Sequence, residues 1–531
     1  MASNLTSLPA LLVDEPALGQ VLGRANALLA VPEPARAITI AGLAHVSSRS
    51  PIVVAMPTST DAERLARDLA AYLGPDEVDL FPAWETLPFE RVSPSTETMG
   101  RRARTLWRLH LAATDQPGGP RVIVASGRAL VQRLGPHVDE SAPIVVAPAD
   151  QIDATDLVDR LVGIGYRREY QVEHRGEVAV RGSIVDVFPS TADAPIRIDL
   201  WGDEVDRLSE FSVADQRSTV DVERVEIFAC RELLPSDDVR ARAEELIAEQ
   251  PWGREQWERL SEGLTFDGME SWLPWLTTDE RVLLDLLPED AQILLVEPRR
   301  MRDRAADILA EEADLAATLA KTWDAGDLDF PRLHLPFDRL LAQTKAPAWT
   351  MATAPESPDV ATVIAAGWNP VVGDGAHLVK QLQDLLRDGY TVIVGADGAG
   401  SAQRLDQILN EQGFHFGLDL DGTASLTKPG GVITVAPLER GFILPSIRLA
   451  VLAESDVTGR RRAHRRARPR KQAAQGFFDD LKPGDHVVHF QHGVARYGGM
   501  VKRAIGGVER DYLLLEYRGD CLLYTSPSPR D

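Results

Sequence analysis

The sequence predicts a multidomain α/β protein, because apolar strand-like runs alternate with amphipathic helical stretches along a chain too long for one core. The chain has 531 residues, whereas single domains usually hold ~100 to 200 residues. Its hydrophobic content of 44% and charged content of 26% are ordinary for a soluble globular protein, and no apolar run reaches the ~20 residues that a membrane span needs. No basic region precedes the short apolar patch at the N-terminus, so a secretory signal is not indicated. We expect a cytoplasmic protein without membrane contact.

An α/β pattern covers residues 1–130 and returns over residues 221–349. Strands are predicted at "PIVVAMP" and "RVIVAS" in the first part and at "AQILLVEP" in the second. The stretch "STDAERLARDLAAYLG" predicts a helix that is capped by Ser59 or Thr60 and ends at Gly74. This order of strands and helices is typical of nucleotide-binding domains.

Residues 131–220 have a different pattern, which predicts an antiparallel α+β domain. A short amphipathic helix is predicted from Asp153, and strands follow in "GEVAVRGSIVDVFP" and "PIRIDLWGDEVDRLSEF". The second of these strands alternates apolar with polar or aromatic residues: Ile196, Ile198 and Leu200 alternate with Arg197, Asp199 and Trp201. One face of this sheet is therefore expected to be buried, and the other to face solvent or a partner.

The C-terminal part is predicted to hold a small α/β domain over 350–455, a basic linker over 456–480 and a small β unit over 481–520. The stretch "AWTMATAPESPD" is interpreted as a linker before the α/β domain. The net charge of −23 argues against nucleic-acid binding over the whole surface. Eight of the thirteen residues in Gly459–Lys471 are basic. This composition fits either a solvated linker or a segment that binds the phosphates of a nucleic acid.

A nucleotide site of the P-loop type is not supported. Such a loop needs the pattern G-x-x-x-x-G-K-[ST], in which backbone N–H groups hold the phosphates and Lys neutralises their charge. The best candidate is "IAGLAHVSSRS", where counting from Gly42 puts Ser47 at the second glycine and Ser48 at the lysine. The first of the seven lysines is Lys321, so no other loop of the first domain supplies the missing lysine. We interpret Gly42, Ser47 and Ser48 as a degenerate nucleotide loop.

Other chemistry is not indicated either, and we predict no catalytic residue and no metal. Cys230 and Cys521 are the only cysteines, which excludes a disulfide framework and CxxC spacing. His486, His489 and His492 follow one another at intervals of three residues on a predicted strand. Neighbouring histidines therefore point to opposite faces of the strand, which argues against a shared metal ion. The sequence is typical of a set of binding modules.

Three stretches identify a resemblance to a known family. They are "FPAWETLPFERVSPSTETMGRRARTLWRL", the run from "GYRRE" through "GEVAVRGSIVDVFPS" to "PIRIDLWGDEVDRLSEFSVADQRS", and "LKPGDHVVHFQHGVARYGGM". In this order they resemble the N-terminal half of the bacterial transcription-repair coupling factors. The second stretch is shared with the excision-repair protein UvrB, whereas the third is not.

The resemblance implies a degenerate P-loop-type α/β domain split by an inserted α+β domain, a further α/β domain, and a truncated C-terminal barrel of the SH3-like or CarD-like kind. The insert would bind UvrA through Arg181 and Gly182, to which we add Arg167 and Phe188. The barrel would bind the RNA polymerase β subunit through Tyr512, Leu513, Leu514 and Leu515.

For the complete family the resemblance implies ATP and Mg as cofactors, and an ATP-driven DNA translocase that makes most of the DNA contacts. This chain would hold only the recruiting half, without helicase motifs and without a cofactor of its own. Two alternatives stay open. One is a UvrB-type damage-verification subunit, and the other is a motor-less scaffold or CarD-like transcription regulator.

The last eleven residues, "CLLYTSPSPRD" from Cys521 to Asp531, depart from the family pattern. We interpret them as translated sequencing-adaptor sequence, because they match a common adaptor and alternate Ser with Pro where a β-ladder needs N–H donors. This interpretation leaves the small β unit without its closing strands. It predicts an unpaired strand edge near Leu515.

Overall fold

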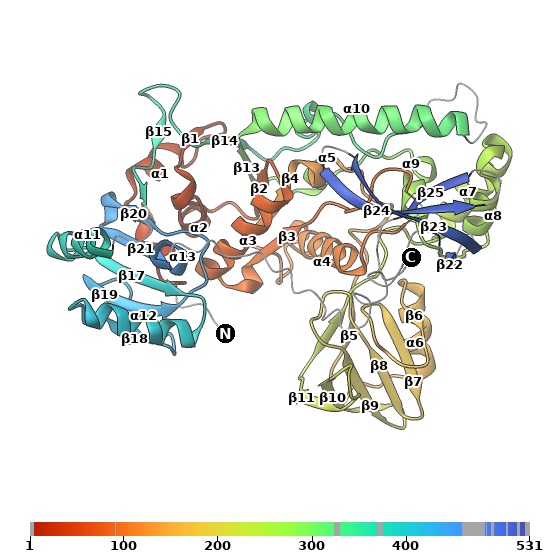
Figure 1. The fold of residues 1–531 in the computed structure, drawn as a ribbon, viewed down its shortest axis with the longest axis horizontal. Helices are drawn as coiled ribbons and strands as arrows, with labels where there is room; N and C mark the ends of the chain where they lie inside the picture. The colour runs from red at the N-terminus through yellow and green to blue at the C-terminus, as the bar shows by residue number, and fades with distance from the viewer. Residues whose placement is uncertain are drawn as a thin grey trace. The chain divides into compact units, whose positions relative to one another are not determined.

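The computed structural model describes residues 5–90, 92–322, 330–368 and 375–458, residue 484, and four strands between residues 486 and 525. The chain forms two compact units, Met1–Arg460 and Arg461–Asp531. The predicted α/β multidomain class is confirmed, with parallel and mixed sheets (Figure 1). None of the described helices is long and apolar enough to span a membrane.

The first sheet of unit 1 has seven parallel strands in the order β15-β1-β14-β13-β2-β4-β3. In that order the strands are Ala361–Thr362, Leu28–Ala30, Ala348–Ala352, Gln292–Val296, Ile52–Met56, Val122–Ser126 and Val78–Phe81. The helices connecting or following these strands are α1 (Pro16–Val21), α2 (Arg36–Val46), α3 (Ser59–Leu73), α4 (Thr96–Ala113), α5 (Gly127–Val131) and α10 (Pro298–Thr322). The predicted strands β2, β4 and β13 are confirmed. Helix α3 is also confirmed, although its cap is Thr58, whose side chain accepts a hydrogen bond from the Asp61 N–H.

The predicted linker "AWTMATAPESPD" is wrong in its first half, because residues 348–352 form β14 inside this sheet. Trp349 and Met351 alternate into the core, and the Trp349 Nε1–H donates to the Arg24 carbonyl at 2.9 Å. The Pro and Ser residues that indicated a linker follow the strand. The chain therefore adds β14 and then the short edge strand β15 to the first sheet before it enters the next domain.

The insert is a six-stranded sheet in the order β11-β10-β9-β8-β7-β6, with a small two-stranded sheet of β12 and β5 beside it. The six strands are β6 (Arg167–Arg168), β7 (Glu177–Arg181), β8 (Ile184–Val187), β9 (Ile196–Trp201), β10 (Glu204–Phe211) and β11 (Ser218–Asp221). The other elements are β5 (Ile144–Val146), α6 (Ala154–Gly163) and β12 (Val225–Ile227). Helix α6 begins, as predicted, after Asp153, whose side chain accepts hydrogen bonds from the N–H groups of Thr155 and Asp156. The insert's core spans residues 144–230.

A helical segment follows the insert and leads back to the first sheet. Its helices are α7 (Asp237–Glu249), α8 (Arg254–Ser261) and α9 (Leu273–Leu276), and it contains a buried cluster rich in tryptophan. A third, mixed sheet has the order β16-β20-β21-β17-β19-β18. Its strands are, in that order, Ala366–Gly367, Phe442–Leu444, Leu449–Ala453, Thr391–Ala396, Gly430–Val435 and Gly417–Asp419. Its helices are α11 (Gly375–Arg387), α12 (Ala399–Glu411) and α13 (Glu454–Thr458).

Unit 2 is described through four antiparallel strands in the order β22-β23-β24-β25. They are β22 (His486–His489), β23 (Gly493–Ile505), β24 (Val508–Tyr517) and β25 (Cys521–Thr525). The basic segment Gly459–Lys471 lies outside the described residues.

Candidate functional site

The six-stranded sheet of the insert has one covered face and one largely open face. Helix α6 lies against β6, β7 and β8, and the apolar residues Val185 and Ile198 face it in the core (Figure 1). Arg181 pairs with Ile184 across β7 and β8, and Ile184 pairs with Asp199 across β8 and β9. Paired residues share a face and successive residues alternate, so Arg181 and Asp199 lie on the open face, opposite Val185 and Ile198. This alternation confirms the division into a buried and a polar face that the sequence predicts.

Arg181 is held in place by a buried carboxylate. Its guanidinium forms an ion pair with Asp186, which is only 1% exposed, while Arg181 itself keeps 37% of its side chain exposed. Arg197 binds the same carboxylate with two hydrogen bonds, Nε to Oδ1 at 2.8 Å and Nη2 to Oδ2 at 3.0 Å. Asp186 therefore positions Arg181 at the surface, whereas a long side chain without such a partner samples many rotamers.

The other predicted residues of the insert lie near this open face. Gly182 forms the tight turn between β7 and β8 with φ of +64°, a conformation that suits glycine, and nothing lies within 4 Å of a Cβ built there. Arg167 is exposed on the edge strand β6 and pairs with Glu177, which puts it on the same face as Arg181. The structure thus gathers Arg167, Arg181 and Gly182 on the open side of the sheet.

Phe188 does not join them, which corrects the prediction of an apolar interface anchor at this position. It is 9% exposed and packs in a small cluster with Val172, Ala179 and Phe211. The Arg175 guanidinium lies over its ring, 5.5 Å from the centroid. The aromatic side chain is used for internal packing, because the chain segment around Val172 covers this end of the open face.

The insert is anchored to α4 by close polar and apolar contacts. The Arg175 Nη1 lies 3.1 Å from Glu97 Oε2, and a Cβ at Gly100 would lie 2.3 Å from Ser190 Oγ.

Tyr166 and Cys230 are buried packing residues of the insert. The Tyr166 hydroxyl donates to the Phe228 carbonyl at 3.0 Å. Burial raises the pKa of the neighbouring Cys230 to about 12, so this thiol stays protonated at neutral pH and acts as a packing residue.

The prediction of a degenerate nucleotide loop at Gly42, Ser47 and Ser48 is wrong, because Gly42 lies in a helix and Ser47 ends it. Gly42 lies in the middle of helix α2, where a Cβ would lie 2.5 Å from Leu12, so this glycine permits close packing. Ser47 is the C-cap residue of that helix, and Ser48 follows it. The error arose because "ITIA" has the composition of a strand but lies within a helix.

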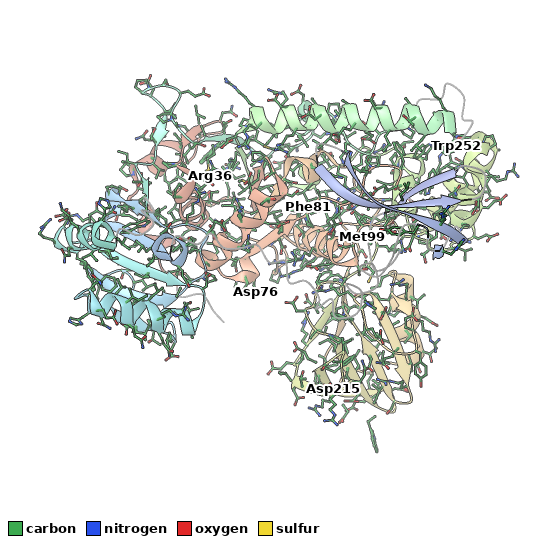
Figure 2. All side chains as sticks on the ribbon, in the orientation of Figure 1. Arg36, Asp76, Phe81, Met99, Asp215 and Trp252 are labelled. Carbon is green, nitrogen blue, oxygen red and sulfur yellow. The ribbon has the colours of Figure 1, made fainter. Side chains whose placement is uncertain are left out.

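The strand, loop and helix that a phosphate site needs are instead β1, residues 31–35 and α2. The loop "VPEPA" contains no glycine and two prolines, which reduces the number of backbone N–H donors. Arg36 opens the helix (Figure 2) and is 7% exposed. Its Nη2 donates to Glu297 at 3.4 Å and to Thr353 at 3.1 Å. Glu297 and Thr353 thus bind Nη2 of Arg36, whereas its buried Nε has no hydrogen-bond partner in the described structure.

In unit 2 the expected free edge near Leu515 is wrong. Strand β24, which contains Tyr512 to Leu515, pairs with β23 on one side and with β25 on the other. Leu515, for example, lies opposite Tyr497 and Leu523. The segment Cys521–Thr525 therefore forms a strand, despite the Ser and Pro residues that follow it. Its interpretation as adaptor sequence stays a prediction.

Comparison with known proteins agrees with this division into modules. The family model described as UvrB interaction domain matches residues 144–233, and the model described as CarD-like/TRCF RID domain matches residues 481–527. Transcription-repair-coupling factors are similar over most of the chain. That of Mycobacterium bovis is 34% identical over 97% of this chain and 44% of its own length. Those of Myxococcus xanthus and Bacillus subtilis are 31% and 26% identical, over 90% and 92% of this chain and 43% of their own lengths.

Fold and matches together describe a multidomain α/β protein in which one segment matches the UvrB interaction domain and another matches the CarD-like/TRCF RID domain. The chain is similar to transcription-repair-coupling factors over nearly its whole length, which confirms the resemblance that the sequence motifs carry. It spans less than half the length of these relatives.

Proposed function

We propose that this chain is the recruiting part of a transcription-repair coupling factor in nucleotide excision repair. The insert binds UvrA, and the C-terminal strands bind the β subunit of stalled RNA polymerase. The relatives are more than twice as long, and we assign ATP-driven DNA translocation, with its ATP and Mg, to the part of their length outside this match. The protein acts in the cytoplasm and holds no cofactor in the residues of this chain.

The observation that carries this proposal is the open sheet face with Arg181 fixed by Asp186, within the segment that matches the UvrB interaction domain. An arginine held in one orientation loses little entropy on binding, and arginine is frequent among the residues that dominate interface energies. Arg167 and Gly182 extend the surface on the same side of the sheet. A protein partner with a carboxylate opposite Arg181 would complement this face.

For unit 2, the match to the CarD-like/TRCF RID domain supports contact with RNA polymerase. We place this contact at Tyr512, Leu513, Leu514 and Leu515. Both edges of β24 are already paired, so these residues contact polymerase through the faces of the sheet and not by adding a strand to β24. We further assign unit 2 to an SH3-like or CarD-like barrel and the first sheet to a degenerate P-loop-type domain.

Replacing Arg181 by alanine is expected to weaken binding of UvrA by about tenfold or more, as truncation of an interface arginine typically does. Binding is measured by calorimetry with the full chain and UvrA from the same organism. Arg160→Ala is the matched control, because Arg160 is half exposed on α6, which covers the other face of the sheet. Equal UvrA affinity for the wild-type chain and Arg181→Ala would refute the site.

The rival function, a UvrB-type damage-verification subunit, requires a working nucleotide site. We expect that MgATP does not raise the unfolding temperature of this chain, because the loop before α2 lacks glycine and Arg36 is bound by Glu297 and Thr353. Differential scanning fluorimetry with increasing MgATP provides the measurement, since a ligand at 100 times its dissociation constant stabilises by about 2.7 kcal/mol. A saturable rise that disappears in Arg36→Ala would support the rival.

A further inference from the structure

We infer that Gln216 is a positioning residue for the contact between Arg181 and UvrA, because its side chain and its loop hold the Arg181 guanidinium in one orientation. This inference rests on the proposed function of the insert and adds a residue that acts through Arg181. Gln216 lies in the loop 212–217, which connects β10 and β11. It meets Arg181 across 35 positions of the sequence.

The side-chain amide of Gln216 is fixed at both ends. Its Nε2 donates to the carbonyls of Val172 at 3.3 Å and Val213 at 3.1 Å. These two carbonyls take both hydrogens of the amide nitrogen, so the amide oxygen faces the other way. That oxygen, Oε1, accepts from Arg181 Nη2 at 3.4 Å. The bond is long and therefore weak by itself, but it gives the guanidinium a second acceptor beside Asp186.

The backbone of Gln216 holds a second arginine of the same face. The Arg197 Nη1 donates to the Gln216 carbonyl at 3.0 Å, while Nε and Nη2 of Arg197 bind Asp186. Gln216 thus contacts both guanidinium groups that share the Asp186 carboxylate. Arg181 can leave its position only by giving up both acceptors, so this network restricts it more than Asp186 alone would.

The backbone conformation of Gln216 is unusual and is maintained by its surroundings. Its φ is +59°, in the left-handed region that a residue with a long side chain seldom adopts. The Gln216 N–H donates to the Ser212 carbonyl at 2.8 Å, and the Ser212 N–H donates to the Arg217 carbonyl at 3.0 Å, so the loop closes on itself. Such a conformation persists where the surrounding contacts outweigh its cost, and it is frequent at functional sites.

Ordering Arg181 before UvrA arrives has a direct consequence for affinity. A long side chain that becomes ordered only on binding lowers affinity by about two- to tenfold. Arg181 keeps 37% of its side chain exposed although it is held by Asp186, so it is accessible and already ordered. The loop 212–217 therefore contributes to UvrA affinity through Arg181 and needs no contact of its own with UvrA.

The test measures UvrA affinity by calorimetry for the full chain and its Gln216→Gly and Gln216→Asn variants. Glycine and asparagine both tolerate a positive φ. Glycine has no side chain and asparagine is one methylene shorter, so neither bridges the partners of Gln216, and we expect each to weaken binding about two- to tenfold. Asp215→Asn is the control from the same loop, because its amide oxygen can still accept from the Arg217 N–H, as Asp215 Oδ1 does at 3.3 Å. This control should bind UvrA like the wild-type chain.

A double-mutant cycle separates the positioning of Arg181 from a general effect on the loop. In an Arg181→Ala background, Gln216→Gly should cause no further loss of UvrA affinity, because the guanidinium that it positions is gone. A merely structural role of Gln216 would lower affinity equally in both backgrounds. The same cycle with Gln216→Asn, and the urea midpoint of every variant, control for a loop that glycine loosens.

The possible failures have different meanings for the proposed function. If both Gln216 variants bind like the wild-type chain while Arg181→Ala weakens binding, Gln216 does not position Arg181, but the insert still binds UvrA. The same conclusion follows if the loss caused by Gln216→Gly is as large in the Arg181→Ala background. If the wild-type chain itself shows no binding to UvrA, the proposed function fails and the role of Gln216 fails with it.

Discussion

Replacing Glu232 by alanine is expected to lower the free energy of unfolding by about 3–5 kcal/mol, the usual cost of leaving a buried charge without its partner. Glu232 binds Arg102 through two hydrogen bonds, from Nε at 2.6 Å and from Nη2 at 2.9 Å, and the two side chains are 2% and 0% exposed. The Trp84 Nε1–H donates to the same carboxylate at 2.9 Å. Without Glu232, the Arg102 guanidinium would stay buried over the Phe81 ring with too few acceptors.

The Arg102–Glu232 pair and the hydrogen bond from Trp84 connect three parts of the fold, which explains the size of the expected effect. Arg102 lies on α4, Trp84 follows β3, and Glu232 follows the last strand of the insert. The measurement is urea unfolding followed by tryptophan fluorescence. Glu226→Ala is the control, because Glu226 forms an exposed pair with Arg224 and such pairs contribute little. If both variants unfold at the same urea concentration, the buried pair does not stabilise the connection between insert and first domain.

Local patterns were sufficient to predict many elements of the fold. Strand β2 is a short, fully apolar run and β4 is apolar up to Ser126, and all five residues of each are buried. Helix α6 carries both a cap at Asp153 and an apolar face, and β9 alternates as predicted. In each case the signal lies within the element itself.

The failures have a common physical cause, because in each case a distant part of the chain decides the local structure. Residues 348–352 become a strand since β1 and β13 offer free edges on both sides. Gly42 lies within a helix that packs on Leu12. Likewise, the Arg102–Glu232 pair spans 130 positions in the sequence, and neither residue carries a local signal that it is buried.

The candidate site was predicted in part. The motif "VRG" identified Arg181 and Gly182, and the structure gathers them with Arg167 on the open face. Asp186 was missed, although its alternation with Val185 and Val187 places it on the face of Arg181 and could have revealed it. Phe188 was added because it is near this motif in the sequence and because an apolar anchor suits an interface. Its burial depends on Val172 and Phe211, which come from other segments of the insert.

Replacing Trp257 by alanine is the second large effect, an expected loss of about 3–5 kcal/mol from removing a large aromatic side chain from a packed core. Trp257 is 0% exposed and contacts Trp272 edge to face, with ring centroids 5.1 Å apart. The ring centroid of Trp252 lies 5.9 Å from that of Trp257, and the Trp257 Nε1–H donates to the Gln250 carbonyl at 3.0 Å.

Gly253 shows how closely this ring is packed, because a Cβ at that position would lie 2.7 Å from Trp257 Nε1. The surroundings therefore cannot collapse easily into the cavity left by alanine, and Trp257→Phe should recover part of the loss. Urea unfolding and near-ultraviolet circular dichroism give the measurement. Trp201→Ala is the matched control, since it removes the same side chain from an exposed position. Equal unfolding midpoints for the two alanine variants would mean that the tryptophan cluster does not hold α7, α8 and α9 together.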